Sequence, residues 1–119
     1  MIVFARFGFE GAHRLPRVPE GHKCGRLHGH NWTVEIHCEG EPDDDTGFVI
    51  DFYAVEEAWK RRVYDVLDHR YLNDVAGLEN PTTENMAMWM WAQLKREVPS
   101  LHRIVIHETP QFGVVYEGR

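Results

Sequence analysis

Alternation of apolar and polar residues, interrupted by turn residues, predicts four strands. They cover residues 2–13, 28–39, 102–109 and 111–116. A period of two places successive side chains on opposite faces of a strand, as in a sheet with one buried face. In the first strand the apolar odd positions lead in register to His13, and in the second the even positions begin with His28 and His30. The pattern therefore places three histidines on apolar strand faces.

Between the second and third strands the apolar spacing changes to that of a helix. Asp51 can cap a helix that begins near Phe52, and apolar residues then recur three and four positions apart as far as Leu67. The run Pro81-Thr82-Thr83-Glu84 begins a second helix, which Pro99 ends. The order ββααββ predicts an α+β fold, with an antiparallel four-stranded sheet and two helices packed on one face.

Composition and charge restrict the class of protein. A chain of 119 residues, of which 43% are apolar, predicts one globular domain over residues 1–119. The net charge of −6 argues against a nucleic-acid partner, because no basic stripe is present to neutralise phosphates. The two cysteines make no disulfide framework, and we find neither a signal peptide nor a membrane span, so we expect a cytoplasmic protein without a membrane partner. The acidic turn at residues 41–47 is interpreted as a solvated connection.

The histidines suggest a metal centre. His28 and His30 are two residues apart and share one face of a strand. A first strand that ends at His13 beside a second strand that begins at His28 brings three imidazoles together. Three nitrogen ligands with an open fourth position are typical of a catalytic zinc site. The simpler alternative, ordinary polar residues at strand ends, fits one histidine better than a His-x-His pair with a third histidine beside it.

Three further features could carry acid–base chemistry. Cys24 lies four residues before His28, where it could be a base beside the metal or a fourth metal ligand, and the spacing favours neither. Asp68-His69 joins a carboxylate to an imidazole, although neighbouring side chains on a helix diverge. Glu108 ends an apolar strand face and needs a partner there, either a salt bridge or a ligand that carries N–H groups.

Several runs of the sequence resemble one enzyme family. The clearest are Gly11-Ala12-His13-Arg14-Leu15 and the stretch from Glu20 to Asn31, which contains Cys24-Gly25-Arg26-Leu27-His28-Gly29-His30. The likeness continues through Gly47–Phe52, Leu67–His69, Tyr71–Asn73, Pro81–Asn85 and Glu108-Thr109. Together these runs resemble the 6-pyruvoyltetrahydropterin synthase superfamily, and within it the 6-carboxytetrahydropterin synthases of queuosine biosynthesis.

The resemblance implies a fold, an assembly and roles for the site residues. The fold would be the tunnelling fold, or T-fold, in which the sheets of several subunits join into a barrel with the helices outside. The assembly would be a homohexamer of two trimers with sites at subunit interfaces. The implied roles are zinc (Zn²⁺) binding for His13, His28 and His30; proton transfer for Cys24, His69 and Glu108, with Asp68 orienting His69; and pterin binding for Glu108, Thr82 and Thr83.

The activity implied by the resemblance is that of a zinc-dependent lyase. It would convert 7,8-dihydroneopterin triphosphate to 6-carboxy-5,6,7,8-tetrahydropterin and release acetaldehyde and triphosphate. The short gap between Cys24 and His28 goes with this product, because the pyruvoyl-forming relatives carry a longer gap. The alternatives are a 6-pyruvoyltetrahydropterin synthase, a non-catalytic zinc- or pterin-binding module, and a zinc hydrolase. An acid–base pair has no use in a binding module, and a hydrolase has no need of Glu108 as a pterin anchor.

Overall fold

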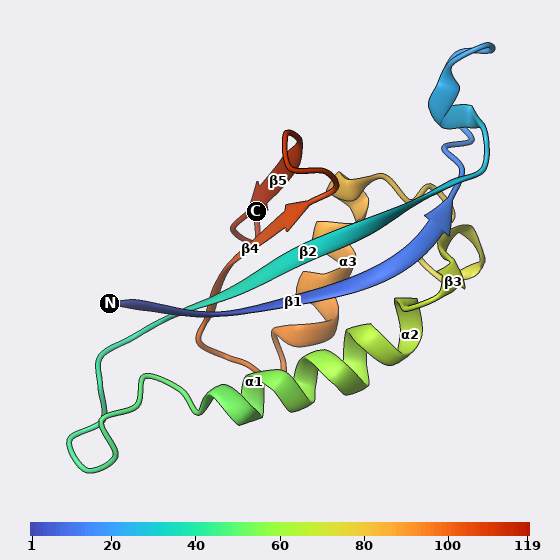
Figure 1. Cartoon of the computed structure of the whole chain (residues 1–119). Helices are drawn as coiled ribbons and strands as arrows, with labels where there is room; N and C mark the ends of the chain where they lie inside the picture. The colour runs from blue at the N-terminus through green and yellow to red at the C-terminus, as the bar shows by residue number, and fades with distance from the viewer.

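The computed structural model describes residues 1–119 and shows a sheet with helices on one face (Figure 1). The strands are β1 (Ile2–His13), β2 (His28–Glu39), β3 (Arg70–Tyr71), β4 (Leu101–His107) and β5 (Gly113–Tyr116). The helices are α1 (Phe52–Trp59), α2 (Asp65–Leu67) and α3 (Thr83–Leu94). The molecule is elongated, with extents of 57 × 24 × 23 Å. The predicted α+β class is confirmed, as is the order of two strands, a helical region and two strands.

The sheet differs from the predicted one in having a fifth strand. The strand order is β3-β1-β2-β4-β5, and the four predicted strands pair antiparallel. The additional β3 pairs parallel to the end of β1, with Arg70 opposite Gly11 and Tyr71 opposite Ala12. The prediction of a wholly antiparallel, four-stranded sheet is corrected in this respect. A strand of two residues is too short to show alternation, so no pattern marks it in the sequence.

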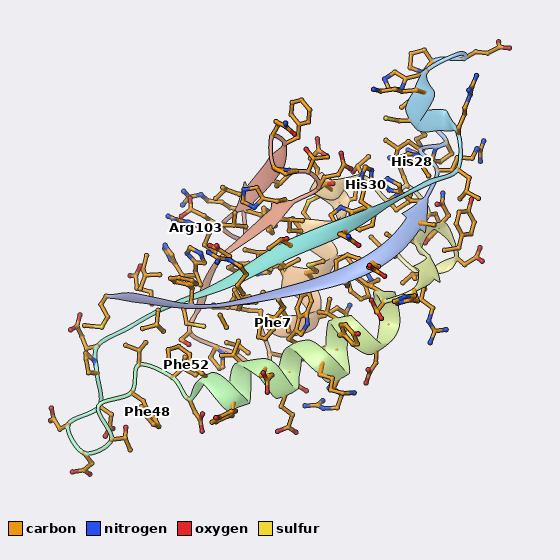
Figure 2. All side chains as sticks on the ribbon, in the orientation of Figure 1. Phe7, His28, His30, Phe48, Phe52 and Arg103 are labelled. Carbon is orange, nitrogen blue, oxygen red and sulfur yellow. The ribbon has the colours of Figure 1, made fainter.

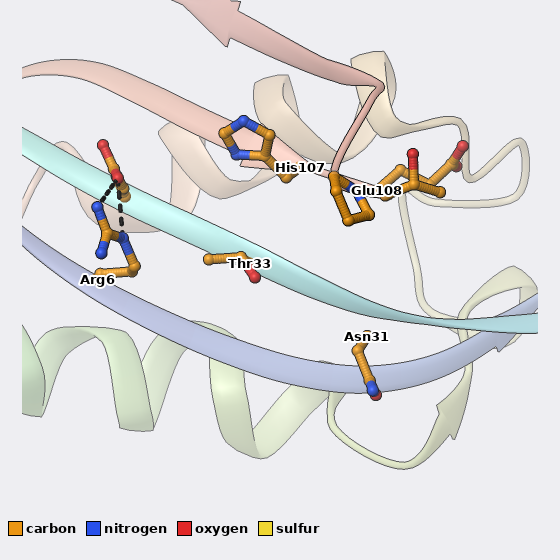
Figure 3. Close-up of a pocket in the computed structure, with 8 residues that line it drawn as sticks. Arg6, Asn31, Thr33, His107 and Glu108 are labelled. Carbon is orange, nitrogen blue, oxygen red and sulfur yellow. Dashed lines mark hydrogen bonds and ion pairs between the residues drawn. The ribbon is translucent and has the colours of Figure 1, made fainter.

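The two faces of the sheet have different chemistry. Odd residues of β1 and even residues of β2 face the helices, where Phe9, Trp32 and Val34 are buried. The opposite face is polar, and Arg6 pairs there with Glu35 across the strands at 2.6 Å (Figure 3). Because β1 and β2 remain in register from end to end, the apolar face leads directly to the histidines. Whether a position is odd or even along β1 and β2 thus decides on which face of the sheet its side chain lies, and it places the three histidines on the face that packs on the helices.

The helical region between β2 and β3 is continuous but not uniform. Asp51 caps α1 as predicted, with its side chain accepting from the backbone N–H of Tyr53 at 2.9 Å. A π-helical segment, Lys60–Tyr64, joins α1 to α2. In an α-helix with about 3.6 residues per turn, side chains four residues apart do not point in quite the same direction. The wider turn of the π-helical segment compensates for this difference, so Trp59, Val63 and Leu67 all remain buried on one side. Phe52, the first residue of the predicted apolar spacing, is 55% exposed in the first turn of α1 (Figure 2).

Both edges of the sheet are open within one chain. The outer edge of β1 pairs with β3 only at Gly11 and Ala12, and β5 has no neighbour beyond it. Open edges of this kind are templates for pairing with another chain. None of the helices has the length and hydropathy that crossing a bilayer would require.

Candidate active site

The three histidines meet at one end of the sheet. His13 and His28 are directly opposite each other in the β1–β2 register, and His30 lies two residues further along β2 (Figure 2). One ring nitrogen from each lies within 4.8 Å of those of the other two. His13 is fully buried, whereas His28 and His30 are partly exposed. The cluster is therefore anchored on its inner side and accessible from outside.

Hydrogen bonds to the backbone fix the tautomers of two of these rings. His13 Nδ1 donates to the carbonyl oxygen of Pro81 at 2.8 Å, and His28 Nδ1 donates to that of Arg26 at 2.7 Å. A carbonyl only accepts, so Nδ1 must carry the proton in both rings. The two Nε2 atoms, 2.9 Å apart, then point lone pairs at each other when the rings are neutral. Burial lowers the pKa of His13 and of His30 and favours that neutral form.

This arrangement fits a divalent metal ion. A cation between the rings would replace the repulsion of the facing lone pairs by coordination, and the Nδ1–H bonds would orient the ligands. Imidazole nitrogens suit zinc, copper, iron and nickel, and three of them leave a position for a further ligand. No thiol belongs to the cluster, because the nitrogens of the histidines alone form it.

Cys24 lies beside the cluster on the wall of a cavity of about 580 Å³. It is held in a short 3₁₀ turn, Lys23–Gly25, in which its N–H donates to His22 Nδ1 at 3.0 Å and its carbonyl accepts from Leu15 N at 2.9 Å. The same cavity is lined by His28, His30 and Glu108. One chain thus brings a thiol, two histidines of the cluster and a carboxylate to a common space.

Glu108 reaches this cavity because it continues β4 beside β2. The β2–β4 register ends with Thr33 opposite His107, and the Glu108 carboxylate lies 3.8 Å from His30 Nε2. Thr83 Oγ1 donates to that carboxylate at 3.0 Å, and Trp32 Nε1 donates to Thr83 Oγ1 at 3.4 Å. The buried indole and hydroxyl thus hold the carboxylate in place.

Thr82, in contrast, uses its hydroxyl to cap α3. Its Oγ1 accepts from Asn85 N at 3.0 Å. Thr82 and Thr83 both line a second hollow next to Glu108. The role of Trp32 was not predicted, because its even position in β2 indicated only burial in the core.

Asp68 and His69 form a hydrogen-bonded pair elsewhere. Asp68 Oδ2 and His69 Nδ1 are 2.7 Å apart, and Asp68 Oδ1 accepts from the N–H of Glu10 at 3.0 Å. His69 has a left-handed backbone conformation, with φ of 57°, so the helical divergence of neighbouring side chains does not apply. Its Nε2 lies 3.1 Å from Glu10 Oε2. The sequence contained no signal for the contact with Glu10.

Within one chain, His69 does not line the cavity that holds Cys24. It borders a hollow together with Glu10 and Asn31, which belong to the polar face of the sheet, whereas the histidine cluster continues the opposite face. The expectation that Cys24 and His69 act in one site is therefore not met by a single copy of the chain. The physical reason is that β1 and β2 separate the two positions.

Comparison with known proteins places the chain in a family. A family model described as 6-pyruvoyl tetrahydropterin synthase matches residues 2–119. The chain belongs to the 6-pyruvoyl tetrahydropterin synthase family. The T-fold expected from the resemblance is the fold of this family, and the prediction is confirmed for the α+β fold of the single chain. The joining of several sheets into a barrel stays a prediction.

Relatives in this family differ in the reactions for which they are named. The chain is 41% identical to a 6-carboxy-5,6,7,8-tetrahydropterin synthase of Synechocystis sp., over 91% of this chain and 86% of the relative. It is 34% identical to a dihydroneopterin monophosphate aldolase of Pyrococcus furiosus, over 97% and 96%. The structure of the Caenorhabditis elegans 6-pyruvoyl tetrahydropterin synthase superimposes with a TM-score of 0.90 at 27% identity, covering 100% of this chain and 96% of the other.

In this family member, we expect Asp68→Asn to lower the pKa of His69. The hydrogen bond with Asp68 raises the pKa of His69 above its ordinary 6.5. A raised pKa means that folding favours the protonated ring. The pair thus contributes to the free energy of unfolding below about pH 6.5, and this contribution is lost as pH rises through the folded-state pKa.

Titration of the His69 ring protons by NMR measures this effect. Asp68→Asn should bring the pKa of His69 back toward 6.5. Glu10→Gln should lower this pKa by a smaller amount than Asp68→Asn does, because Glu10 raises it less than Asp68 does. An unchanged pKa in Asp68→Asn would show that the two side chains do not pair in solution.

Proposed function

We propose that the chain is a zinc-dependent carbon–carbon lyase, a 6-carboxytetrahydropterin synthase. With water, it would convert 7,8-dihydroneopterin triphosphate to 6-carboxy-5,6,7,8-tetrahydropterin, acetaldehyde and triphosphate, within 7-deazaguanine and queuosine biosynthesis. The observation that carries the proposal is the common cavity of Cys24, His28, His30 and Glu108. The relative from Synechocystis sp., 41% identical, is named for this reaction.

The residues of the chain suit the steps of such a reaction. Zinc held by His13, His28 and His30 would supply a Lewis acid that polarises a substrate hydroxyl and acidifies its neighbouring C–H bond. Cys24 would accept a proton as thiolate at the cavity wall. Glu108, held by Thr83, would accept hydrogen bonds from the amino group and N3–H of the pterin. The carboxylate would thereby fix the side chain of the substrate over the histidines.

A second proton carrier would come from a neighbouring subunit. We propose that His69, oriented by Asp68, enters the cavity of another copy within a homohexamer of two trimers. The position of His69 on the polar face, away from Cys24 of its own chain, supports this arrangement, as do the open edges of β1 and β5. Light scattering measures the assembly, and an active monomer would contradict the proposal.

Product analysis by mass spectrometry tests the reaction. Purified protein loaded with zinc is incubated with 7,8-dihydroneopterin triphosphate, and acetaldehyde is trapped with a hydrazine reagent. The proposal requires 6-carboxytetrahydropterin and acetaldehyde in equal amounts. Triphosphate release without acetaldehyde would indicate 6-pyruvoyltetrahydropterin synthase instead. Dihydroneopterin monophosphate must be tested as a second substrate in this assay, because the relative from Pyrococcus furiosus is named an aldolase for that compound.

Glu108→Gln is expected to weaken pterin binding. The amide keeps the shape of the side chain but loses the charge and replaces one acceptor oxygen by a donor. It therefore cannot accept hydrogen bonds from both the amino group and the N3–H of the pterin. Hydrogen bonds to charged groups contribute about 1.5–3 kcal/mol, so the dissociation constant of dihydroneopterin should rise by about 10-fold to 100-fold. Isothermal calorimetry measures it, with Glu117→Gln as the matched change outside the cavity. Equal affinities in all three proteins would remove Glu108 from the pterin site.

A further inference from the structure

The basic residues of the chain are distributed unevenly. Five of them, two on the sheet and three in the π-helical segment, pair with carboxylates, namely Arg6, Arg103, Lys60, Arg61 and Arg62. Residues 11–34, in contrast, contain four basic residues and a single acidic one, Glu20, in a chain of net charge −6. Within this segment neither Lys23 nor Arg26 forms an ion pair, although both line the cavity of Cys24. The cavity therefore has two unneutralised cations at its wall.

The backbone holds these two cations on either side of Cys24. Arg26 N donates to the carbonyl of Lys23 at 3.1 Å, which closes the turn. The carbonyl of Arg26 accepts from His28 Nδ1, so the turn is also tied to the histidine cluster. Lys23 and Arg26 consequently belong to the same hydrogen-bonded turn as the thiol, and this turn is joined to His28.

The groups that line the cavity also follow an order along the chain. Lys23, Cys24 and Arg26 come first, His28 and His30 follow on β2, and Glu108 lies next to His30 at 3.8 Å. Lys23 and Arg26 lie in the turn before β2, whereas Glu108 follows the end of β4, so the cations and the carboxylate reach the cavity from different segments of the chain. The wall of one cavity therefore combines two cations, two histidines of the cluster and a carboxylate that accepts hydrogen bonds.

We infer that Lys23 and Arg26 form a binding site for the phosphate chain of the substrate, beside Cys24 and in the same cavity as Glu108. This inference rests on the proposed function for the identity of the substrate, but the site itself is for a polyphosphate group. Arg26 can bind phosphate oxygens through two N–H groups at once, and Lys23 contributes a point charge. Such contacts hold the leaving triphosphate near the thiol and the histidine cluster.

The experiment compares ligands with and without phosphate. In zinc-loaded Cys24→Ala protein, whose turnover we expect to be slow enough for binding to be measured first, Lys23→Met and Arg26→Met are added singly and together. Methionine keeps an unbranched side chain and removes the charge. Arg96→Met, which removes an exposed basic residue that forms no ion pair at the other end of α3, is the matched control. The ligands are dihydroneopterin triphosphate, dihydroneopterin and inorganic tripolyphosphate, with zinc content measured after each titration.

Each single change should weaken dihydroneopterin triphosphate about tenfold at low ionic strength, and the effect should shrink in high salt. Dihydroneopterin should bind equally to all variants, and tripolyphosphate should follow the triphosphate. Unchanged affinity for the triphosphate in the double variant, or an equal loss for dihydroneopterin, would overturn the inference.

The two proposals can fail separately. A protein that binds tripolyphosphate through Lys23 and Arg26 but forms no pterin product supports the phosphate site and contradicts the proposed function. A protein that forms 6-carboxytetrahydropterin equally well after both changes, with an unchanged KM, supports the function and contradicts the phosphate site.

Discussion

Replacing Cys24 with alanine is expected to slow turnover by about 10²–10⁴-fold while the protein keeps its metal. General acid–base groups contribute a factor of this size. The metal should remain because the cluster consists of nitrogens of three histidines and includes no sulfur. Metal content by elemental analysis and turnover by product formation are measured on one sample.

The control for this change is the other cysteine. Cys38 is buried on β2, and burial raises the pKa of its thiol, so it is expected to be inert. Cys38→Ala should retain turnover and lose only stability, which urea unfolding measures. Release of zinc from Cys24→Ala, together with lost turnover, would instead identify Cys24 as a metal ligand.

The second large effect is expected for His28→Ala, which should lose both metal and turnover. The change removes one of three ligands and leaves an open, partly exposed position. Loss of an outer-shell partner alone costs 10-fold to 100-fold in metal affinity, so removing a ligand should cost at least about 100-fold. His28 is a better choice than His13, because His13 is buried and its bond to Pro81 also ties β1 to the start of α3.

Dialysis followed by elemental analysis measures the loss. His102→Ala, a histidine outside the cluster, is the matched control and should keep its metal. Equal metal content in both variants, with turnover intact, would exclude the histidine cluster as the metal centre.

The parts of the fold that follow from local patterns could be predicted from the sequence. Period-two alternation placed β1 and β2, and the same parity placed His13, His28 and His30 on one face. Capping chemistry placed the start of α1 at Asp51 and the start of α3 within the run from Pro81 to Glu84, where Thr82 proves to be the cap. These features depend on residues close together in the chain or on a register that runs without interruption from one end to the other.

The parts that depend on distant contacts could not be predicted. Nothing near His69 in the sequence indicates that Glu10 is its neighbour, or that its left-handed conformation turns it toward Asp68. The hydrogen bonds from Trp32 through Thr83 to Glu108 connect β2, α3 and the end of β4. The separation of His69 from Cys24 likewise depends on which face of the sheet each one reaches. Such relations are set by packing in three dimensions rather than by periodicity.

The position of the histidines at the base of the loop has a mechanical consequence. His13 and His28 are the residues at which the chain leaves β1 and enters β2, so an ion shared between them would staple the ends of the segment 14–27. Joining the two ends of this segment through an ion reduces the number of conformations that the segment can adopt, as a covalent cross-link does. The segment that carries Cys24, Lys23 and Arg26 would then be ordered by the same ion that, in the proposed function, would activate the substrate. Metal binding would thus fix the positions of the thiol and the two cations at the same time. In a chain without its metal, the segment 14–27 would be the first to be cleaved by proteases.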